Sequence, residues 1–283
     1  FFIFVSLVLV VVSIATYVLK GKEAFGIDFA GGQIQEYIFD KPVAVDEVRK
    51  SLQEVGMGDA LIQQFKDNAR VVVIRSPSDT STVVQQQLRT KLGNNPFQIL
   101  RIENVGPVVG RQLKAKAMAA IIWSLIGILI YVAFRFKHFD FALGGVVALA
   151  HDVIVATGFL LFFNRQIDLL IVTALLTLAG YSINDTIVIY DRIRELMQKM
   201  HKASIAEIIN LAMNQMLSRT IITSMVTILV VVSLFFFGGE VLNGFAFVLL
   251  VGIIVGSYST IFIAAPLVIA FHGLSVRKYK PTH

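Results

Sequence analysis

Six long runs of apolar residues dominate the pattern of hydrophobic and polar positions along the chain. A helix that crosses the roughly 30 Å hydrocarbon core of a bilayer needs about 20 consecutive apolar residues. Each run approaches or exceeds that length, so the pattern predicts six transmembrane helices. They lie at about 1–19, 117–134, 141–163, 167–190, 217–237 and 243–271.

A polar stretch at 20–116 separates the first two runs and has the patterning of a small folded domain. Segments with strand-like alternation and segments with helical spacing follow one another in the order βαββαβ. This order is typical of a ferredoxin-like split βαβ unit. The sequence therefore predicts an all-α membrane protein with an α+β ferredoxin-like domain inserted between its first and second membrane helices. The expected domains are 1–19, 20–116, 117–273 with a basic loop at 191–216, and a tail at 274–283.

The composition agrees with a membrane protein. Of the 283 residues, 56% are hydrophobic and 16% are charged, whereas soluble domains have about 45–50% apolar and about 25% charged residues. The mean hydropathy is +0.74. The chain has no cysteine, which excludes disulfide frameworks, Cys-ligated metals and Cys catalysis. Because the chain opens on Phe1 and Phe2 without a Met, we expect the native start to lie upstream.

Basic residues gather on one side of the predicted membrane helices. The net charge of +6 therefore reflects membrane topology rather than nucleic-acid binding. The positive-inside rule places these loops and the tail in the cytoplasm, and the 20–116 segment on the outer side. The residues that set this orientation are Arg135, Lys137, Arg192, Arg194, Lys199, Lys202, Arg277, Lys278 and Lys280.

The polar segment carries no catalytic signature. It has no Walker A, H-E-x-x-H, G-x-S-x-G or dinucleotide glycine motif. The sequence thus predicts a protein that is not an enzyme and that needs no cofactor or metal. The candidate chemistry lies inside the apolar runs, where each ionisable side chain is costly and is therefore a candidate functional group.

Asp185 lies in the fourth run, about six residues or roughly 9 Å before its expected cytoplasmic edge. Thr173, Thr177 and Tyr181 precede it at intervals of four, so these side chains share one helix face that should meet protein or water. The alternative is a carboxylate that simply reaches the interface at a helix end. The apolar residues at 186–190 favour a group within the membrane.

Arg219 enters the fifth run from the cytoplasmic side, and Thr223 and Thr227 follow at intervals of four. It reaches about the depth of Asp185, so antiparallel neighbouring helices could bring the two together. An Asp beside an Arg stays ionised, and a buried Asp that loses its Arg binds a proton. The pair would be the minimum machinery for proton coupling. The alternative is that Arg219 only reaches to lipid headgroups as an anchor.

The secondary candidates are Asn184, Asp152, Thr223 and Tyr181. Asp152, which follows His151 in the third run, is either a relay carboxylate or a packing group among small residues. Glycines flank both crossings from the polar segment into the membrane, and they permit either hinge motion or tight turns. These hinge candidates are Gly26, Gly31, Gly32, Gly106 and Gly110.

Four strings together resemble one known family. They are GIDFAGG at 26–32, VGPVVG at 105–110, YSINDTIVIYDRIRE at 181–195 and SRT at 218–220. The combination resembles the SecF subunits of bacterial SecDF protein-export complexes, a family related to RND transporters. The resemblance extends over essentially the whole chain, and the 181–195 string is its most specific part.

The resemblance implies a bacterial inner-membrane protein with a periplasmic domain. It implies SecD and the SecYEG channel as partners, exported unfolded polypeptide as cargo, and the proton-motive force as the energy source. The family's proton-pathway Asp and Arg fall on Asp185 and Arg219. Two alternatives stay open: an RND-type exporter of small molecules or lipids, and a passive scaffold for another channel.

Overall fold

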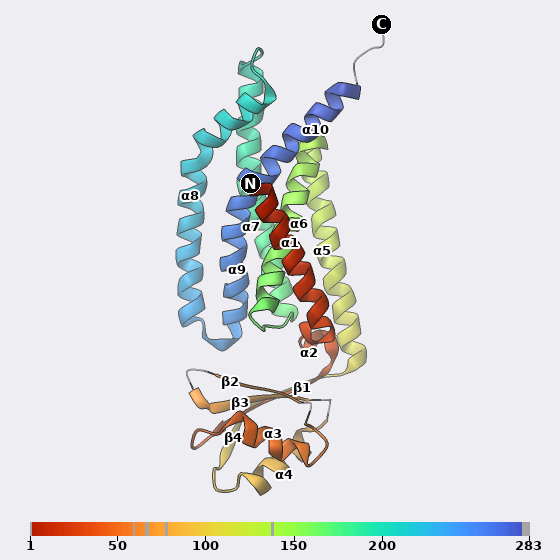
Figure 1. Ribbon diagram of the computed structural model, residues 1–283, viewed down its shortest axis with the longest axis vertical. Helices are drawn as coiled ribbons and strands as arrows, with labels where there is room; N and C mark the ends of the chain where they lie inside the picture. The colour runs from red at the N-terminus through yellow and green to blue at the C-terminus, as the bar shows by residue number, and fades with distance from the viewer. Residues whose placement is uncertain (1, 59, 66–67, 77–78, 137–138, 279–283) are drawn as a thin grey trace. The chain divides into compact units, whose positions relative to one another are not determined.

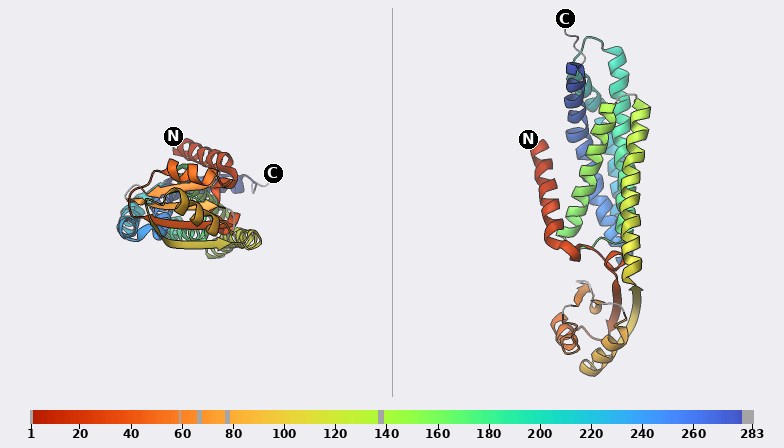
Figure 2. Two further views of the ribbon diagram at one scale, coloured as in Figure 1. Left: turned by 90° about the horizontal axis from the view of Figure 1, so that it is seen from below. Right: turned by 90° about the vertical axis from the view of Figure 1, so that its right-hand side faces the viewer.

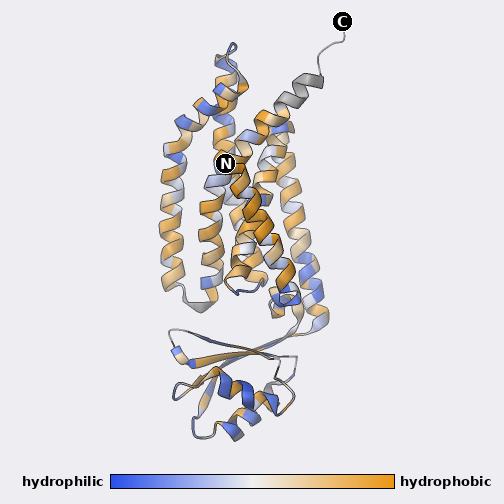
Figure 3. Cartoon of the chain, in the orientation of Figure 1, coloured by the Kyte–Doolittle hydropathy of each residue, from blue (hydrophilic) through white to orange (hydrophobic). Residues whose placement is uncertain are grey.

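The computed structural model describes residues 2–58, 60–65, 68–76, 79–136 and 139–278 (Figure 1). The chain divides into two compact units. One contains Phe1–Ala24 and Ala117–His283, and is called the membrane unit here; the other, Phe25–Lys116, is called the sheet unit. Figure 3 shows that hydrophobic residues cover most of the length of the membrane-unit helices, whereas the sheet unit mixes hydrophobic and hydrophilic positions.

The membrane unit contains all six predicted spans, because the described residues include six helices long and apolar enough to cross a membrane. The last span, Val241–Phe271, is assembled from three consecutive helical segments. The helices are α1 (Phe2–Lys20), α5 (Pro107–Phe136), α6 (Phe139–Phe162), α7 (Leu169–Lys199), α8 (Ile205–Phe237), α9 (Gly239–Ser259), the π-helix η2 (Thr260–Ala264) and α10 (Ala265–Lys278).

The loop predicted near 191–216 is much shorter than predicted, because both ends of that range are helical. Helix α7 continues to Lys199 and α8 begins at Ile205. Glu195 pairs with Lys199 one turn later, at 2.6 Å, which stabilises the end of α7. Ser204 and Glu207 form a reciprocal capping box that starts α8. Likewise, α5 begins at Pro107, ten residues before the expected span, and proline is favoured in the first turn of a helix.

The interior of the membrane unit lies around α6, α7 and α9. Helix α6 packs against α1, α7 and α9, and α9 also packs against α7 and α8. Over half of the most apolar stretch of α6 and of α7 is buried (56% each), compared with 17% for α8 and 11% for α5. Helices α5 and α8 therefore offer most of their surface to lipid or to another protein.

The sheet unit has the predicted βαββαβ order. Its elements are α2 (Ile27–Ala30), β1 (Gly32–Phe39), α3 (Val45–Gln53), β2 (Leu61–Phe65), β3 (Asn68–Ser76), α4 (Ser81–Lys91) and β4 (Phe97–Val105), and the 3₁₀-helix η1 (Gly21–Ala24) precedes them in the membrane unit. The strand order is β2-β3-β1-β4, and every neighbouring pair is antiparallel. Helices α3 and α4 lie on the same face of the sheet (Figure 2). Between them and the sheet, Tyr37, Phe39, Leu52, Ile74 and Leu88 form the centre of the core.

Close backbone approaches explain several of the flanking glycines. Gly31 and Gly32 adopt positive φ values of 75° and 128°, which L side chains rarely take. A Cβ on Gly31 would lie 2.9 Å from Pro107 Cα, and one on Gly110 would lie 3.1 Å from the Phe29 carbonyl oxygen. Tight packing thus accounts for these three glycines, whereas a hinge role for them, for Gly26 and for Gly106 stays a prediction.

Candidate functional site

Among the side chains that the structure describes, two carboxylates are buried in the membrane unit. Asp152 on α6 is fully buried, and Asp185 on α7 is 6% exposed. Buried charges without partners are costly, particularly where lipid replaces water. The partners of the two carboxylates therefore show what each can do.

Asp185 has a sparse set of partners. Ser224 Oγ on α8 donates to Asp185 Oδ2 over 3.4 Å, the one side-chain hydrogen bond that Asp185 makes within the described residues. Ser224 Oγ also lies 2.7 Å from Ser257 Oγ on α9. Hydroxyl groups both donate and accept, so this short chain links three helices and can orient toward either protonation state of the carboxyl.

Arg219 does not pair directly with Asp185. It is exposed on α8, and in the described part of the chain no carboxylate lies within 4.0 Å of it. Helices α7 and α8 do pack together, but Ser224, five residues after Arg219, meets the carboxylate instead. Arg219 is still close enough for a charge–charge interaction with Asp185.

The predicted polar stripes lie on the surface of this chain. Thr173 and Thr177 on α7 are exposed, as is Thr223 on α8, and Thr227 on α8 is half-buried. Their hydroxyls donate to the carbonyl oxygens four residues earlier, as Ser and Thr do in membrane helices without a nearby partner. Among the described residues, nothing covers Thr173, Thr177 or Thr223, although the pattern suggests a polar neighbour.

The two remaining secondary candidates on α7 differ in their surroundings. Asn184 is exposed next to buried Asp185. Tyr181 is half-buried, and its hydroxyl is buried without a hydrogen-bond partner among the described residues. The donor of this phenol, one turn from Asp185, is therefore unused among the described residues.

Asp152, in contrast, is fully surrounded. Ser182 Oγ and Ser259 Oγ donate to Asp152 Oδ2 over 2.6 and 2.9 Å, and His151 Nδ1 lies 3.1 Å from Oδ1. The serines come from α7 and α9. A Cβ on Gly256 would lie 3.4 Å from the same Oδ2, so the glycine lets α9 approach the carboxylate closely. No role was predicted for His151, and the structure places its ring beside the Asp152 carboxylate.

A π-helical turn directly follows Ser259, one of the partners of Asp152. Pro266 lacks an N–H, and its ring clashes with the carbonyl four residues earlier, that of Phe262; the π-helix Thr260–Ala264 spans this point. Such π-bulges often mark functional sites. Ser259, just before the bulge, binds Asp152, and Thr260 Oγ1 lies 3.1 Å from Thr186 Oγ1, next to Asp185.

Comparison with known proteins places this arrangement in a family. A family model described as "Protein export membrane protein SecD/SecF, C-terminal" matches residues 84–273. A SecF protein translocase subunit from Calditerrivibrio nitroreducens is 44% identical over 98% of this chain and 93% of that protein. The SecF protein translocase subunit of Pseudomonas aeruginosa is 41% identical over 92% of this chain and 85% of that protein.

A solved structure is similar as well. The crystal structure of SecDF from Thermus thermophilus, described as a translocon-associated membrane protein, matches with a TM-score of 0.86 and 36% identity. The match covers 95% of this chain but only 37% of the SecDF chain. With the family model, the full-length relatives and the fold in agreement, this multi-pass membrane protein belongs to the SecF family of protein translocase subunits.

Proposed function

We propose that the chain is the SecF-type partner of SecD in the bacterial inner membrane. Together they would use the proton-motive force to assist unfolded polypeptides across the membrane at the SecYEG channel. The names of its relatives support the export role. The single observation that supports proton coupling is the burial of Asp185 within the membrane unit, with Ser224 as its one side-chain hydrogen-bond partner among the described residues.

In this proposal, Asp185 binds and releases the proton, and Arg219 controls which state is favoured. A carboxylate with one hydrogen bond of 3.4 Å is poorly compensated in the membrane. Approach of Arg219 would favour the ionised form, and its withdrawal would favour the protonated form. A proton that crosses the membrane field releases ~2.3 kcal/mol per 100 mV, which is enough to bias a conformational step.

The exposed stripes provide the proposed contact with SecD. Thr173 and Thr177 on α7, and Thr223 on α8, are polar groups on surfaces that this chain leaves open. A second subunit there would supply further polar groups and complete a route for protons past Asn184 and Tyr181. Asp152 would organise the helices around that route.

The sheet unit would then be the periplasmic domain. Its strand order, β2-β3-β1-β4 with α3 and α4 between the strands in sequence, supports the ferredoxin-like assignment. The basic helix ends near Arg135, Arg194 and Lys199 would face the cytoplasm. Gly26, Gly31, Gly32, Gly106 and Gly110 would flank the crossings on which the domain moves.

Preprotein translocation in inner-membrane vesicles tests the proposal. Vesicles with this chain and SecD should translocate faster than vesicles without this chain, and an uncoupler should remove the difference. Asp185→Asn should remove it too, because the variant keeps the size of the side chain but cannot titrate. The control is Asp191→Asn, the same change six residues later on α7. Normal uncoupler-sensitive export by Asp185→Asn would refute proton coupling through this residue.

A further inference from the structure

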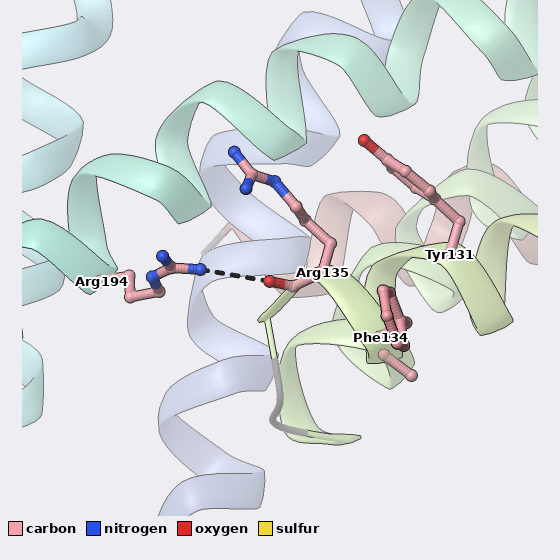
Figure 4. Close-up of a pocket in the computed structure, with 5 residues that line it drawn as sticks. Tyr131, Phe134, Arg135 and Arg194 are labelled. Carbon is pink, nitrogen blue, oxygen red and sulfur yellow. Dashed lines mark hydrogen bonds between the residues drawn. The ribbon is translucent and has the colours of Figure 1, made fainter.

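A second site lies at the end of α5. Tyr131, Ala133, Phe134 and Arg135 of α5 and Arg194 of α7 line a cavity of about 620 Å³ (Figure 4). This volume is within the usual range for a small-ligand site, about 300–1,000 Å³. None of these residues takes part in the carboxylate network, so the site is separate from the one described above.

The cavity carries a positive charge that the protein holds in place. Arg194 Nη1 donates to the carbonyl oxygen of Arg135 over 3.1 Å (Figure 4). That carbonyl is in the last turn of α5, where such groups lack helical partners. One N–H of the guanidinium is thus used as an anchor, and the other donors stay available.

The two arginines differ in their counter-charges. Arg135 Nη2 lies 3.1 Å from Asp191 Oδ2, so that charge is balanced within the protein. No carboxylate in the described ranges lies within 4.0 Å of Arg194. The cavity therefore has a net excess of one positive charge, which suits an anion.

The other walls of the cavity are aromatic and exposed. Tyr131 is 53% exposed and Phe134 is 86% exposed, and both lie in the last two turns of a membrane-crossing helix. Aromatic rings at such a helix end sit at the level of the lipid headgroups. If an anion binds Arg194 at this depth, its charged group lies among the lipid headgroups. The rest of the molecule then contacts Tyr131 and Phe134.

We propose that this cavity binds the phosphodiester headgroup of an anionic phospholipid. Arginine forks match phosphate oxygens in charge and geometry, and basic pockets between membrane helices bind anionic headgroups. Arg194 contacts the phosphate, and Tyr131 and Phe134 pack against the glycerol and the upper acyl chains. The inference rests on the placement of the chain in a membrane and not on its role in export.

Tryptophan quenching by brominated lipids tests this site. The chain has one tryptophan, so Trp123→Phe with Phe134→Trp places a single reporter at the exposed edge of the cavity. In liposomes, brominated lipid at the site should quench the fluorescence of this reporter. The affinity obtained from the quenching should be about fivefold higher for brominated phosphatidylglycerol than for brominated phosphatidylcholine. That factor corresponds to about 1 kcal/mol for one Arg at a membrane surface.

Two further variants in this background make the test specific. Arg194→Gln should abolish the preference, and Arg194→Lys should keep part of it because the charge remains. Arg192→Gln removes the same charge from the same helix, but Arg192 is engaged by Gln215 at 2.7 Å and by Glu195, so the preference should persist. Equal quenching by both lipids, or equal loss in Arg194→Gln and Arg192→Gln, would overturn the proposal. Abolition of the preference by excess inorganic phosphate would assign the cavity to a free anion and overturn the lipid assignment.

Discussion

Asp152 and Asp185, the two carboxylates found buried in the described part of the membrane unit, have very different surroundings. Asp152 is fully buried and has three partners, from its own helix, α7 and α9. Asp185 lies one turn of α7 beyond Ser182, yet it has one long hydrogen bond and a neighbouring helix face that stays exposed. The chain completes one polar site by itself and leaves the other unfinished.

This contrast indicates a structural role for Asp152 and a role in proton exchange for Asp185. A group that folding has fully satisfied gains little from moving, because every displacement breaks short hydrogen bonds. A group with a weak partner and a distant charge changes state at lower cost. We therefore expect substitutions at Asp152 to affect stability first, and substitutions at Asp185 and Arg219 to affect proton-driven export first.

The largest effect should come from Arg219→Leu, which removes the charge that acts on Asp185. Without it, Asp185 is expected to stay protonated, and uncoupler-sensitive export should fall about tenfold or more, since one proton in the field is worth ~2.3 kcal/mol per 100 mV. Arg219→Lys should lose only part of the activity, because it keeps the charge without the planar fork. The measurement is preprotein translocation in vesicles.

The double variant Asp185→Asn with Arg219→Leu checks that the two residues act together. It should be no worse than either single variant, because residues of one device are not additive. If the fold-losses of export in the two single variants multiply in the double variant, Arg219 acts independently of Asp185, for example as a headgroup anchor.

Asp152→Leu should cost about 1–3 kcal/mol in the free energy of unfolding. The substitution leaves Ser182 without its side-chain acceptor in a buried site, whereas Ser259 keeps the Gly256 carbonyl oxygen at 3.1 Å; one unsatisfied buried group costs about 1–3 kcal/mol. Unfolding in mixed detergent micelles, followed by circular dichroism, measures the change. Asp185→Leu, the matched substitution, should cost clearly less, since Asp185 makes one hydrogen bond of 3.4 Å. Equal costs would remove the distinction between the two sites.

Gly252→Ala should reduce the free energy of unfolding by about 1–3 kcal/mol, the usual cost of overpacking. A Cβ at Gly252 would lie 2.3 Å from Leu178 Cδ2, so the buried Leu178 side chain would have to move or α9 and α7 would have to separate. The control is Gly180→Ala on α7, where nothing lies within 4 Å of the new Cβ; alanine there should stabilise the helix by about 0.5–1 kcal/mol. The same unfolding measurement compares them, and similar values for both would contradict the close packing of α7 and α9.

The sequence predicted the candidate functional residues better than it predicted the side chains that contact them. Run length alone identified the six spans, and the cost of ionisable groups in lipid singled out Asp152, Asp185 and Arg219. It could not show that Asp152 would meet Ser259, because a contact across 107 positions depends on which helices become neighbours. Periodicity gives the face of a helix but not its partner.

One part of the fold was missed although its signal was present. The basic segment near 191–216 was predicted to be the loop between two spans, whereas only residues 200–204 lie between α7 and α8. Ser204 and Glu207 have the spacing of a capping box, which marks a helix start. The π-turn was harder to foresee, because Pro266 predicts a disturbance of the helix but not that it widens one turn instead of ending it.

The smallest effect is expected for Ser224→Ala, and it tests the unfinished site most directly. The hydroxyl makes the one side-chain hydrogen bond that Asp185 has in the described chain, so its loss should cost about 1 kcal/mol in stability or less. If that hydroxyl orients Asp185 for proton exchange, however, uncoupler-sensitive export should fall severalfold while insertion stays normal. Ser257→Ala removes the next hydroxyl, 2.7 Å from Ser224 Oγ, and should give a smaller loss in the same assay. Losses in stability without any change in export would assign both serines to packing and would leave Asp185 to exchange protons through groups outside this chain.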